Sequence, residues 1–303
     1  MTRVFESHSD LIVAGGPVRM YRSGNYGPPV LLLHGGALDT AEGVWHDVVP
    51  ALSADFRVYA IDFPRHGASR PWPAGPGCEN RRVRLDAEFF DGFLDELLDR
   101  LALPQTAIVG LSMGAGVGIG YALLRPHRVS ALVAIGPGGI GAKRKAQFAT
   151  WLMLRTPGLL RLASGYLARR PQALRKSLSR NLTAGEATEG FERILTQTRA
   201  EAKAKAAHRE RILDDWMIEA YGPLRMRLNY LPALPGLRVR SLWIRGEQDP
   251  LVGRAEVAAA AAAARAPVVT IPDAGHVVTL DQPADVARVA RRFLSTSGEA
   301  PAR

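Results

Sequence analysis

The sequence is poor in cysteine and in long apolar runs. Cys78 is the single cysteine among 303 residues, so no disulfide can form within the chain, and this scarcity is typical of proteins in a reducing cytoplasm. The apolar runs are shorter than the about 20 residues that a membrane-spanning helix needs. The first ten residues include acids and lack the apolar segment of a secretory signal. We therefore expect a soluble cytoplasmic protein.

Acidic residues are missing from one part of the chain. The net charge is +10, and residues 141–235 hold 18 Lys/Arg against 8 Asp/Glu, whereas the rest of the chain holds 21 of each. Within that segment, residues 141–180 contain ten basic residues and no acid. Such a block is typical of a solvated helical face, of a surface for anionic lipid or of a funnel for acidic substrates. Because neither a nucleic-acid motif nor interleaved aromatic residues accompany it, we expect no nucleic-acid partner.

Short apolar runs alternate with amphipathic segments over most of the chain. Runs such as VLLLH at residues 30–34 are continuously apolar, which indicates strands buried on both faces of a parallel sheet. Residues 84–101 place apolar side chains at helical spacing, with acids on the other face. This alternation predicts an α/β fold with a doubly wound, mostly parallel sheet. The expected strands are two short ones within residues 4–21, then 30–34, 57–62, 107–111, 129–135, 239–244 and 268–271. The expected helices are 84–101, 113–124, 255–264 and 284–294.

The alternation stops at about residue 140 and resumes after residue 235. In between, the pattern is helical throughout. We therefore expect one α/β core domain, formed by residues 1–140 and 236–303, with a helical insertion at residues 141–235. The breaks between helices of the insertion are expected at Pro157, Pro171 and Pro223.

Residues 110–114, GLSMG, follow a predicted strand and precede a predicted helix. In such a turn the serine backbone is strained, and the flanking glycines leave room for it. The hydroxyl of Ser112 is then exposed at a helix N-terminus, where the helix dipole favours developing negative charge. This pattern predicts that Ser112 is a covalent nucleophile.

A serine nucleophile needs a base, and the base needs a carboxylate that orients it. In this architecture the partners follow in the order serine, acid, histidine, each after a strand. His276 follows the predicted strand 268–271 and is the last histidine of the chain. The loop after the preceding strand contains Glu247 and Asp249, and we favour Asp249 because the later position lies above the sheet. Capping of the next helix is the alternative role for Asp249.

A tetrahedral intermediate needs two N–H donors for its oxyanion. Met113, directly after the predicted nucleophile, is expected to supply one. The second is expected from the loop that begins at His34, with Gly36 as first choice and Ala37 as second, because small residues let the backbone approach the substrate. His34 and Gly35 are also expected beside the substrate, with His34 orienting the loop.

Five motifs occur in order along the chain outside the insertion: LLLHGG at 31–36, DFPRHGAS at 62–69, GLSMG at 110–114, GEQDPLV at 246–252 and DAGH at 273–276. With them the sequence resembles the α/β-hydrolase superfamily, in particular its lidded serine enzymes that hydrolyse esters or carbon–carbon bonds. The resemblance implies that Ser112, Asp249 and His276 form a catalytic triad. It also implies that Gly36 and Met113 form the oxyanion hole.

By the same resemblance, residues 141–235 stand where the family has a cap that covers the active site and shapes substrate choice. One motif departs from the family, which usually has Gly-His-Gly where this chain has Arg65, His66 and Gly67. The lost glycine is expected to alter the loop beside the oxyanion site. Epoxide hydrolases and haloalkane dehalogenases have aspartate as the nucleophile, so Ser112 argues against both activities.

The resemblance implies hydrolysis of a carboxylic ester, lactone or related acyl substrate through an acyl-enzyme on Ser112. Alternatives are cleavage of a carbon–carbon bond in a β-diketone-like ring-fission product, and the reaction of a lyase or natural-product tailoring enzyme on the same scaffold. A non-catalytic ligand-binding protein is less favoured, because the catalytic positions are complete. No cofactor and no metal are expected, since serine acyl transfer needs none and the seven histidines are not spaced as zinc ligands. The expected partner is an apolar or acidic small molecule, and the oligomeric state is not predicted.

Apolar residues of the insertion have two interpretations. Residues 151–154, WLML, and the leucines at 159, 160 and 162 are flanked by arginines. They would either line an apolar substrate pocket, with Trp151 as the candidate contact, or rest on an anionic membrane surface. We favour the pocket.

Overall fold

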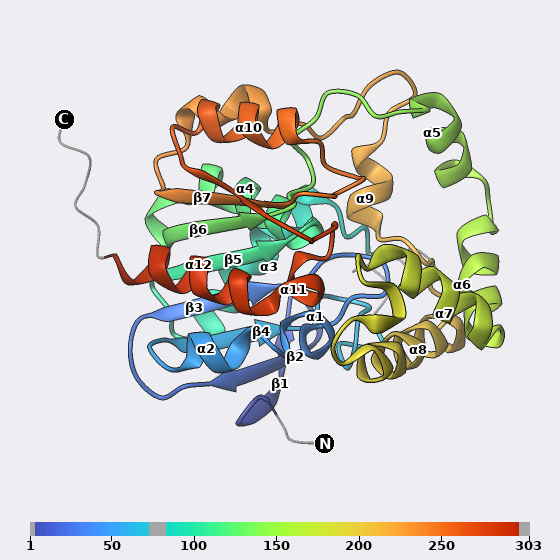
Figure 1. Ribbon diagram of the computed structural model, residues 1–303, viewed down its shortest axis with the longest axis horizontal. Coiled ribbons are helices and arrows are strands. Elements are labelled where there is room, and N and C mark those ends of the chain that lie inside the picture. The colour runs from blue at the N-terminus through green and yellow to red at the C-terminus, as the bar shows by residue number, and fades with distance from the viewer. Residues whose placement is uncertain (1–3, 73–82, 297–303) are drawn as a thin grey trace.

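The computed structural model describes residues 4–72 and 83–296, so Cys78 lies outside the described residues. At its centre is an eight-stranded sheet with the order β1-β2-β4-β3-β5-β6-β7-β8. β2 pairs antiparallel with β1 and with β4, and every other neighbouring pair is parallel. This arrangement confirms the predicted doubly wound, mostly parallel sheet (Figure 1). The strands are β1 Ser7–Val13, β2 Gly16–Ser23, β3 Pro29–Leu33, β4 Arg57–Ile61, β5 Thr106–Leu111, β6 Val129–Ile135, β7 Ser241–Gly246 and β8 Val268–Ile271.

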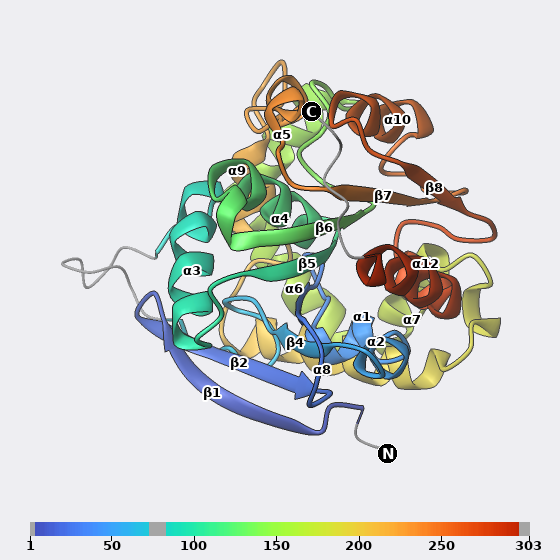
Figure 2. The same cartoon turned by 90° about the vertical axis from the view of Figure 1, so that its left-hand side faces the viewer.

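Helices cover both faces of the sheet, and each face has its own cluster of buried apolar side chains (Figure 2). The strands are apolar on both sides for this reason, and β5 is buried along its whole length. One face is covered by α3 (Ala87–Arg100), α4 (Met113–Leu124) and α10 (Arg254–Ala263), and the other by α1 (Ala41–Trp45), α2 (Val49–Ser53) and α12 (Pro283–Ser295).

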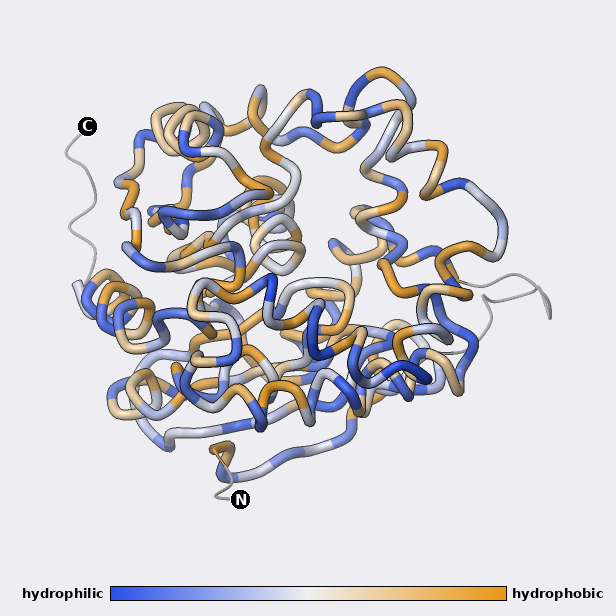
Figure 3. Tube along the Cα trace, turned by 45° about the vertical axis from the view of Figure 1, so that its right-hand side comes forward, coloured by the Kyte–Doolittle hydropathy of each residue, from blue (hydrophilic) through white to orange (hydrophobic). Residues whose placement is uncertain are grey.

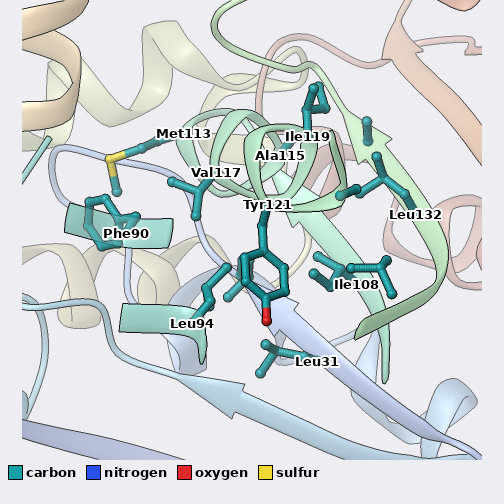
Figure 4. Packing of buried hydrophobic residues seen from close by; sticks show 14 of the residues in the cluster. Leu31, Phe90, Leu94, Ile108, Met113, Ala115, Val117, Ile119, Tyr121 and Leu132 are labelled. Atoms are coloured by element: carbon teal, nitrogen blue, oxygen red, sulfur yellow. The ribbon is translucent and has the colours of Figure 1, made fainter. Parts of the chain in front are cut away.

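The packing around α4 holds the strand-to-helix turn that contains Ser112. Figure 4 shows Tyr121 of α4 between Leu94 of α3 and Ile108 of β5, with Val117 of α4 next to Tyr121 on the side of Phe90. Burial of each such side chain contributes about 1.5–3 kcal/mol. The junction of β5 and α4 is therefore a rigid support for a functional side chain.

The chain leaves the sheet after β6 and returns to it at β7. It forms the helices at the right of Figure 1: α5 (Gln147–Arg155), α6 (Leu159–Arg169), α7 (Pro171–Asn181), α8 (Phe191–Ala207) and α9 (Asp215–Ala220). Pro171 is the first residue of α7, where proline is tolerated because the helix needs no N–H there. A separate cluster joins Leu174 of α7, Ile194 of α8 and Leu280 of α11 (Val278–Asp281). The insertion thus packs against the core next to the loop that precedes α11.

Three short helices are not predicted by the sequence pattern. α1, α2 and α11 have five, five and four residues, which is too few to show a helical period. The helix expected from residue 84 begins at Ala87, because the Asp86 side chain caps it by accepting a 3.1 Å hydrogen bond from the N–H of Phe89. In the part of the chain that the structure describes, no helix is both long and apolar enough to span a bilayer.

Candidate active site

Ser112 lies at the turn between β5 and α4 with φ 52° and ψ −110°, a strained conformation for a residue with a side chain. The flanking glycines are required by close backbone contacts. A Cβ on Gly110 would lie 2.5 Å from the backbone N of Ala115, and one on Gly114 would lie 2.3 Å from the carbonyl oxygen of Leu33. The motif therefore packs the turn tightly and raises the Ser112 side chain above the sheet.

His276 joins Ser112 to Asp249 through two hydrogen bonds. Its Nε2 lies 2.9 Å from Ser112 Oγ, and its Nδ1 lies 3.0 Å from Asp249 Oδ2. With the proton on Nδ1, the imidazole donates to the carboxylate and accepts from the serine hydroxyl. His276 follows β8 and Asp249 follows β7, so parallel strand ends bring the three side chains to one edge of the sheet.

Asp249 is held in its charged form. Burial by itself raises the pKa of Asp249, but the hydrogen bond and charge of His276 outweigh it, so the pKa lies below its usual value. Asp249 Oδ1 also accepts the N–H groups of Leu251 at 2.8 Å and Val252 at 3.0 Å. Glu247, the other acid of this loop, is exposed.

His34 holds the loop that follows β3. Its ring is completely buried, accepts the N–H of Phe63 at Nε2 over 2.9 Å and contacts the carbonyl of Gly35 through Nδ1 at 2.6 Å. Burial keeps the pKa of His34 well below its usual range, so the ring is neutral. These contacts suit a residue that orients the loop.

The insertion reaches this loop through Asp214, which directly precedes α9. Asp214 Oδ2 accepts the N–H of Ala37 at 2.7 Å, so this N–H is not free for a substrate. The N–H groups of Gly36 and Met113 have no acceptor among the described residues. A Cβ on Gly36 would lie 2.6 Å from Asp214 Oδ2, so only glycine fits between the loop and the insertion.

Asp214 belongs to a buried group of charges that connects the insertion to the loop after β4. Its Oδ1 lies 3.1 Å from His66 Nε2 and 3.6 Å from Lys205 Nζ. Burial raises the pKa of Asp214, but His66 and Lys205 lower it far below its usual range, so the carboxylate is charged. Arg70 of the same loop pairs with Glu201 of α8 and, at 3.0 Å, with Glu210. Sequence patterns missed this group because His66 and Arg70 lie more than 100 positions from their acidic partners.

Asp39 is a second functional candidate that the sequence did not indicate. It lines the same cavity as Ser112 and His276 and lies beside Gly35. Burial raises the pKa of Asp39 to about 7; His276 and His66 act in the opposite direction, and Asp214 adds to the rise. A carboxyl group that titrates near neutral pH therefore faces the substrate space.

The cavity above Ser112 has a volume of about 710 Å³ and lies between the core and the insertion. The core contributes Gly36, Ala37, Asp39, Ser112 and His276, whereas His34 and Gly35 do not line it. The insertion contributes mainly apolar side chains, among them Leu167, Leu174, Leu178, Ile194, Ile212 and Met217.

Trp151, expected in the pocket, is not part of the cavity wall, and neither are the leucines at 159, 160 and 162. The physical reason is the orientation of α5 and α6. The Trp151 ring packs in a tilted arrangement against the Phe148 ring, with 5.6 Å between the ring centroids. The buried side of these helices packs on Ile218 of α9. In the described residues, no group of three or more His, Cys, Asp and Glu side chains is arranged to hold a metal ion.

Comparison with known proteins places this architecture in a family. Residues 28–283 match the model of the alpha/beta hydrolase fold family, and the chain belongs to that family. It is 34% identical over 133 residues to 2-hydroxy-6-oxo-6-(2'-aminophenyl)hexa-2,4-dienoic acid hydrolase of Metapseudomonas resinovorans, covering 42% of this chain and 41% of that protein. It is 36% identical over 118 residues to pimeloyl-[acyl-carrier protein] methyl ester esterase of Nitrosomonas europaea, and the match covers 39% of this chain and 40% of that protein. The chain thus matches about two-fifths of the length of these relatives.

Solved structures share the fold over nearly the whole chain. 2-Hydroxy-6-oxo-6-phenylhexa-2,4-dienoate hydrolase from Rhodococcus superposes with a TM-score of 0.73 at 19% identity, covering 95% of this chain and 98% of that one. A carboxylesterase from Bacillus subtilis superposes with a TM-score of 0.71 at 20% identity, and the match covers 96% of this chain and 92% of that one. At such identities the similarity establishes the fold and not the substrate.

Proposed function

We propose that the protein is a serine hydrolase that cleaves a carboxylic ester or related acyl compound through an acyl-enzyme on Ser112. The observation that carries this proposal is the chain of 2.9 and 3.0 Å contacts from Ser112 through His276 to Asp249, starting from a strained turn. A nucleophile, a base and an orienting acid in this order are what nucleophilic catalysis by serine needs. We place the activity in the cytoplasm, which the single cysteine supports.

The reaction proceeds in two steps. Ser112 attacks the carbonyl carbon while its proton passes to Nε2 of His276, and Asp249 stabilises the imidazolium. The N–H groups of Gly36 and Met113 donate to the oxyanion of the tetrahedral intermediate. His276 then protonates the leaving alkoxide, the C–O bond breaks and the acyl group remains on Ser112. Water, deprotonated by His276, attacks the acyl-enzyme, releases the carboxylic acid and restores the serine hydroxyl.

We propose that residues 141–235 act as the cap that selects the substrate. Leu167, Leu174 and Ile194 of this segment line the cavity, which suits an apolar acyl chain. Arg180 also lines the cavity and is exposed, which suits an acidic group at its entrance. The expected substrate is therefore a small molecule with an apolar body.

Cleavage of a carbon–carbon bond is the second candidate function. The Metapseudomonas relative is named as a hydrolase of a hydroxy-oxo-dienoic acid, and it matches 42% of this chain. The same Ser112 and His276 would serve such a reaction. Assays with vinylogous diketones and with p-nitrophenyl esters distinguish the two, since the favoured substrate class should be turned over at least 100-fold more efficiently.

Labelling with a fluorophosphonate tests the nucleophile. Mass spectrometry should find one adduct, on Ser112, in the native protein and none in Ser112→Ala. Ser177 also lines the cavity, so Ser177→Ala is the matched control and should keep the adduct. Failure of the folded wild-type protein to react would overturn the proposal and favour a ligand-binding role.

A further inference from the structure

The outer surface of α5 and α6 is rich in exposed apolar side chains. Of the twelve large apolar residues that are exposed in the described part of the chain, six lie within the short segment 148–166. We call these six residues the outer apolar patch. Its members and their exposed fractions are Phe148 56%, Leu152 52%, Met153 42%, Leu159 39%, Leu162 72% and Tyr166 57%.

The patch is distinct from the substrate cavity. None of its six residues lines the cavity, which α6 reaches through Leu167 instead. The inward sides of α5 and α6 are occupied by Leu154 and Leu160, which pack on Ile218. The helices therefore have a second apolar side that no described part of the chain covers. Figure 1 shows α5 and α6 at the outer edge of the molecule, and in Figure 3 apolar and polar residues alternate along the insertion.

Basic residues are frequent in the sequence on both sides of the patch, and most of them form no ion pair with described residues. Of the ten basic residues in 141–180, Arg144, Arg155 and Arg175 form ion pairs. The other seven are exposed and form no ion pair with described residues, and no acid occurs in this segment. They are Lys143, Lys145, Arg161, Arg169, Arg170, Lys176 and Arg180, of which Arg180 also lines the cavity.

We propose that α5 and α6 dock the protein on an anionic lipid bilayer. Interfacial helices bury aromatic and leucine side chains at the boundary between headgroups and acyl chains, while Lys and Arg bind the anionic headgroups. The patch and its unpaired cations supply both parts. Tyr166 and Phe148 suit the interface, where aromatic rings are preferred.

The charge pattern favours an anionic lipid bilayer as the binding partner of the patch over a second copy of the chain or a nucleic acid. Two copies of the chain that met through this face would bring together two strongly basic segments that contain no acid, and these segments would repel each other. A nucleic acid would neutralise the charge, but its phosphates offer no partner for Leu152 or Leu162. An anionic bilayer satisfies the cations and the leucines together.

Co-sedimentation with vesicles tests the proposal. The wild-type protein should bind vesicles of phosphatidylcholine with 30% phosphatidylglycerol at least tenfold more tightly than phosphatidylcholine alone, and added salt should weaken the binding. Two double variants should each lose at least tenfold in affinity: Arg161→Glu with Arg169→Glu, and Leu152→Ser with Leu162→Ser. Arg238→Glu with Arg292→Glu changes the same charge on exposed core residues and should bind as the wild type does.

Two further measurements keep the outcome clear. Circular dichroism and fluorophosphonate labelling should be unchanged in all variants, because none of these residues lines the cavity. Fluorescence of Trp151, measured against Trp151→Phe, should shift to the blue on anionic vesicles. Absence of salt-sensitive vesicle binding by the folded protein would overturn the proposal. So would a dimer in sedimentation equilibrium that Leu152→Ser with Leu162→Ser dissociates.

Discussion

Arg65 on the loop after β4 donates from Nη1 to Oδ2 of Asp215 at the start of α9, over 2.9 Å, and both side chains are nearly buried. Arg65 has φ +65°, a left-handed conformation that favours glycine. The family usually has glycine at this position. This chain instead combines a strained backbone with an ion pair that links the core to the insertion.

Two substitutions of Arg65 separate strain from charge. Arg65→Gly and Arg65→Ala both remove the ion pair, and for Arg65→Ala we expect the free energy of unfolding to fall by about 2 kcal/mol. This is less than for an isolated buried pair, because Arg211 still pairs with Asp215. Alanine keeps the left-handed strain, so it should be the less stable of the two by ~1 kcal/mol. Urea denaturation measures both. Equal free energies of unfolding for the two variants would contradict the prediction, because they would show that the backbone at position 65 leaves the left-handed conformation in Arg65→Ala.

Asp214 should affect catalysis because it positions the loop after β3, which contains Gly36 and Ala37. Asp214→Ala removes the acceptor of the Ala37 N–H and should lower kcat roughly 10–100-fold with little change in KM, because a small displacement of a donor is costly. An arylboronic acid, which mimics the tetrahedral intermediate, should bind correspondingly more weakly. Asp215→Asn is the control, since it weakens the contact between insertion and core without touching Ala37. A loss confined to KM would contradict this role.

Asp249 should be needed for the rate and not for binding. Asp249→Asn should lower kcat by about 10⁴, because the amide no longer favours the His276 tautomer that accepts the serine proton. Steady-state kinetics on the best p-nitrophenyl ester measures this effect. The exposed Glu247 in the same loop is the matched control, and Glu247→Gln should stay within twofold of wild type. A large effect of Glu247→Gln would reassign the acid.

Asp39 should make stability depend on pH. Its folded-state pKa is raised from 3.8 to about 7, so the folded state holds a proton that the unfolded chain releases between these values. Its contribution to stability is therefore fully present below about pH 4 and is lost as pH rises through about 7. Relative to Asp39→Asn, the wild-type free energy of unfolding should fall over this range. Parallel pH profiles from urea denaturation would contradict the assignment.

The extent of prediction from sequence differs between elements. β3, β5 and β6 were predictable because a strand buried on both faces is a continuous apolar run, and α3 because its apolar residues recur at helical spacing. α1, α2 and α11 could not be predicted, since a helix of about one turn is too short for its apolar residues to recur at helical spacing. The sequence placed apolar residues within 151–162 of α5 and α6 in the substrate pocket, and the structure does not. Apolar residues on a helix do not reveal which side of the helix the rest of the protein covers.

The sequence by itself determined the parallel sheet and the positions of Ser112, Asp249 and His276 at strand ends. These features follow from local patterns, since neighbouring residues show which strands are buried, where the turns lie and in which order the motifs occur along the chain. Only the tertiary structure decided that the Ala37 N–H binds Asp214, and that Trp151 lies outside the cavity. Such contacts join segments far apart in the chain, and they depend on how the insertion packs on the core.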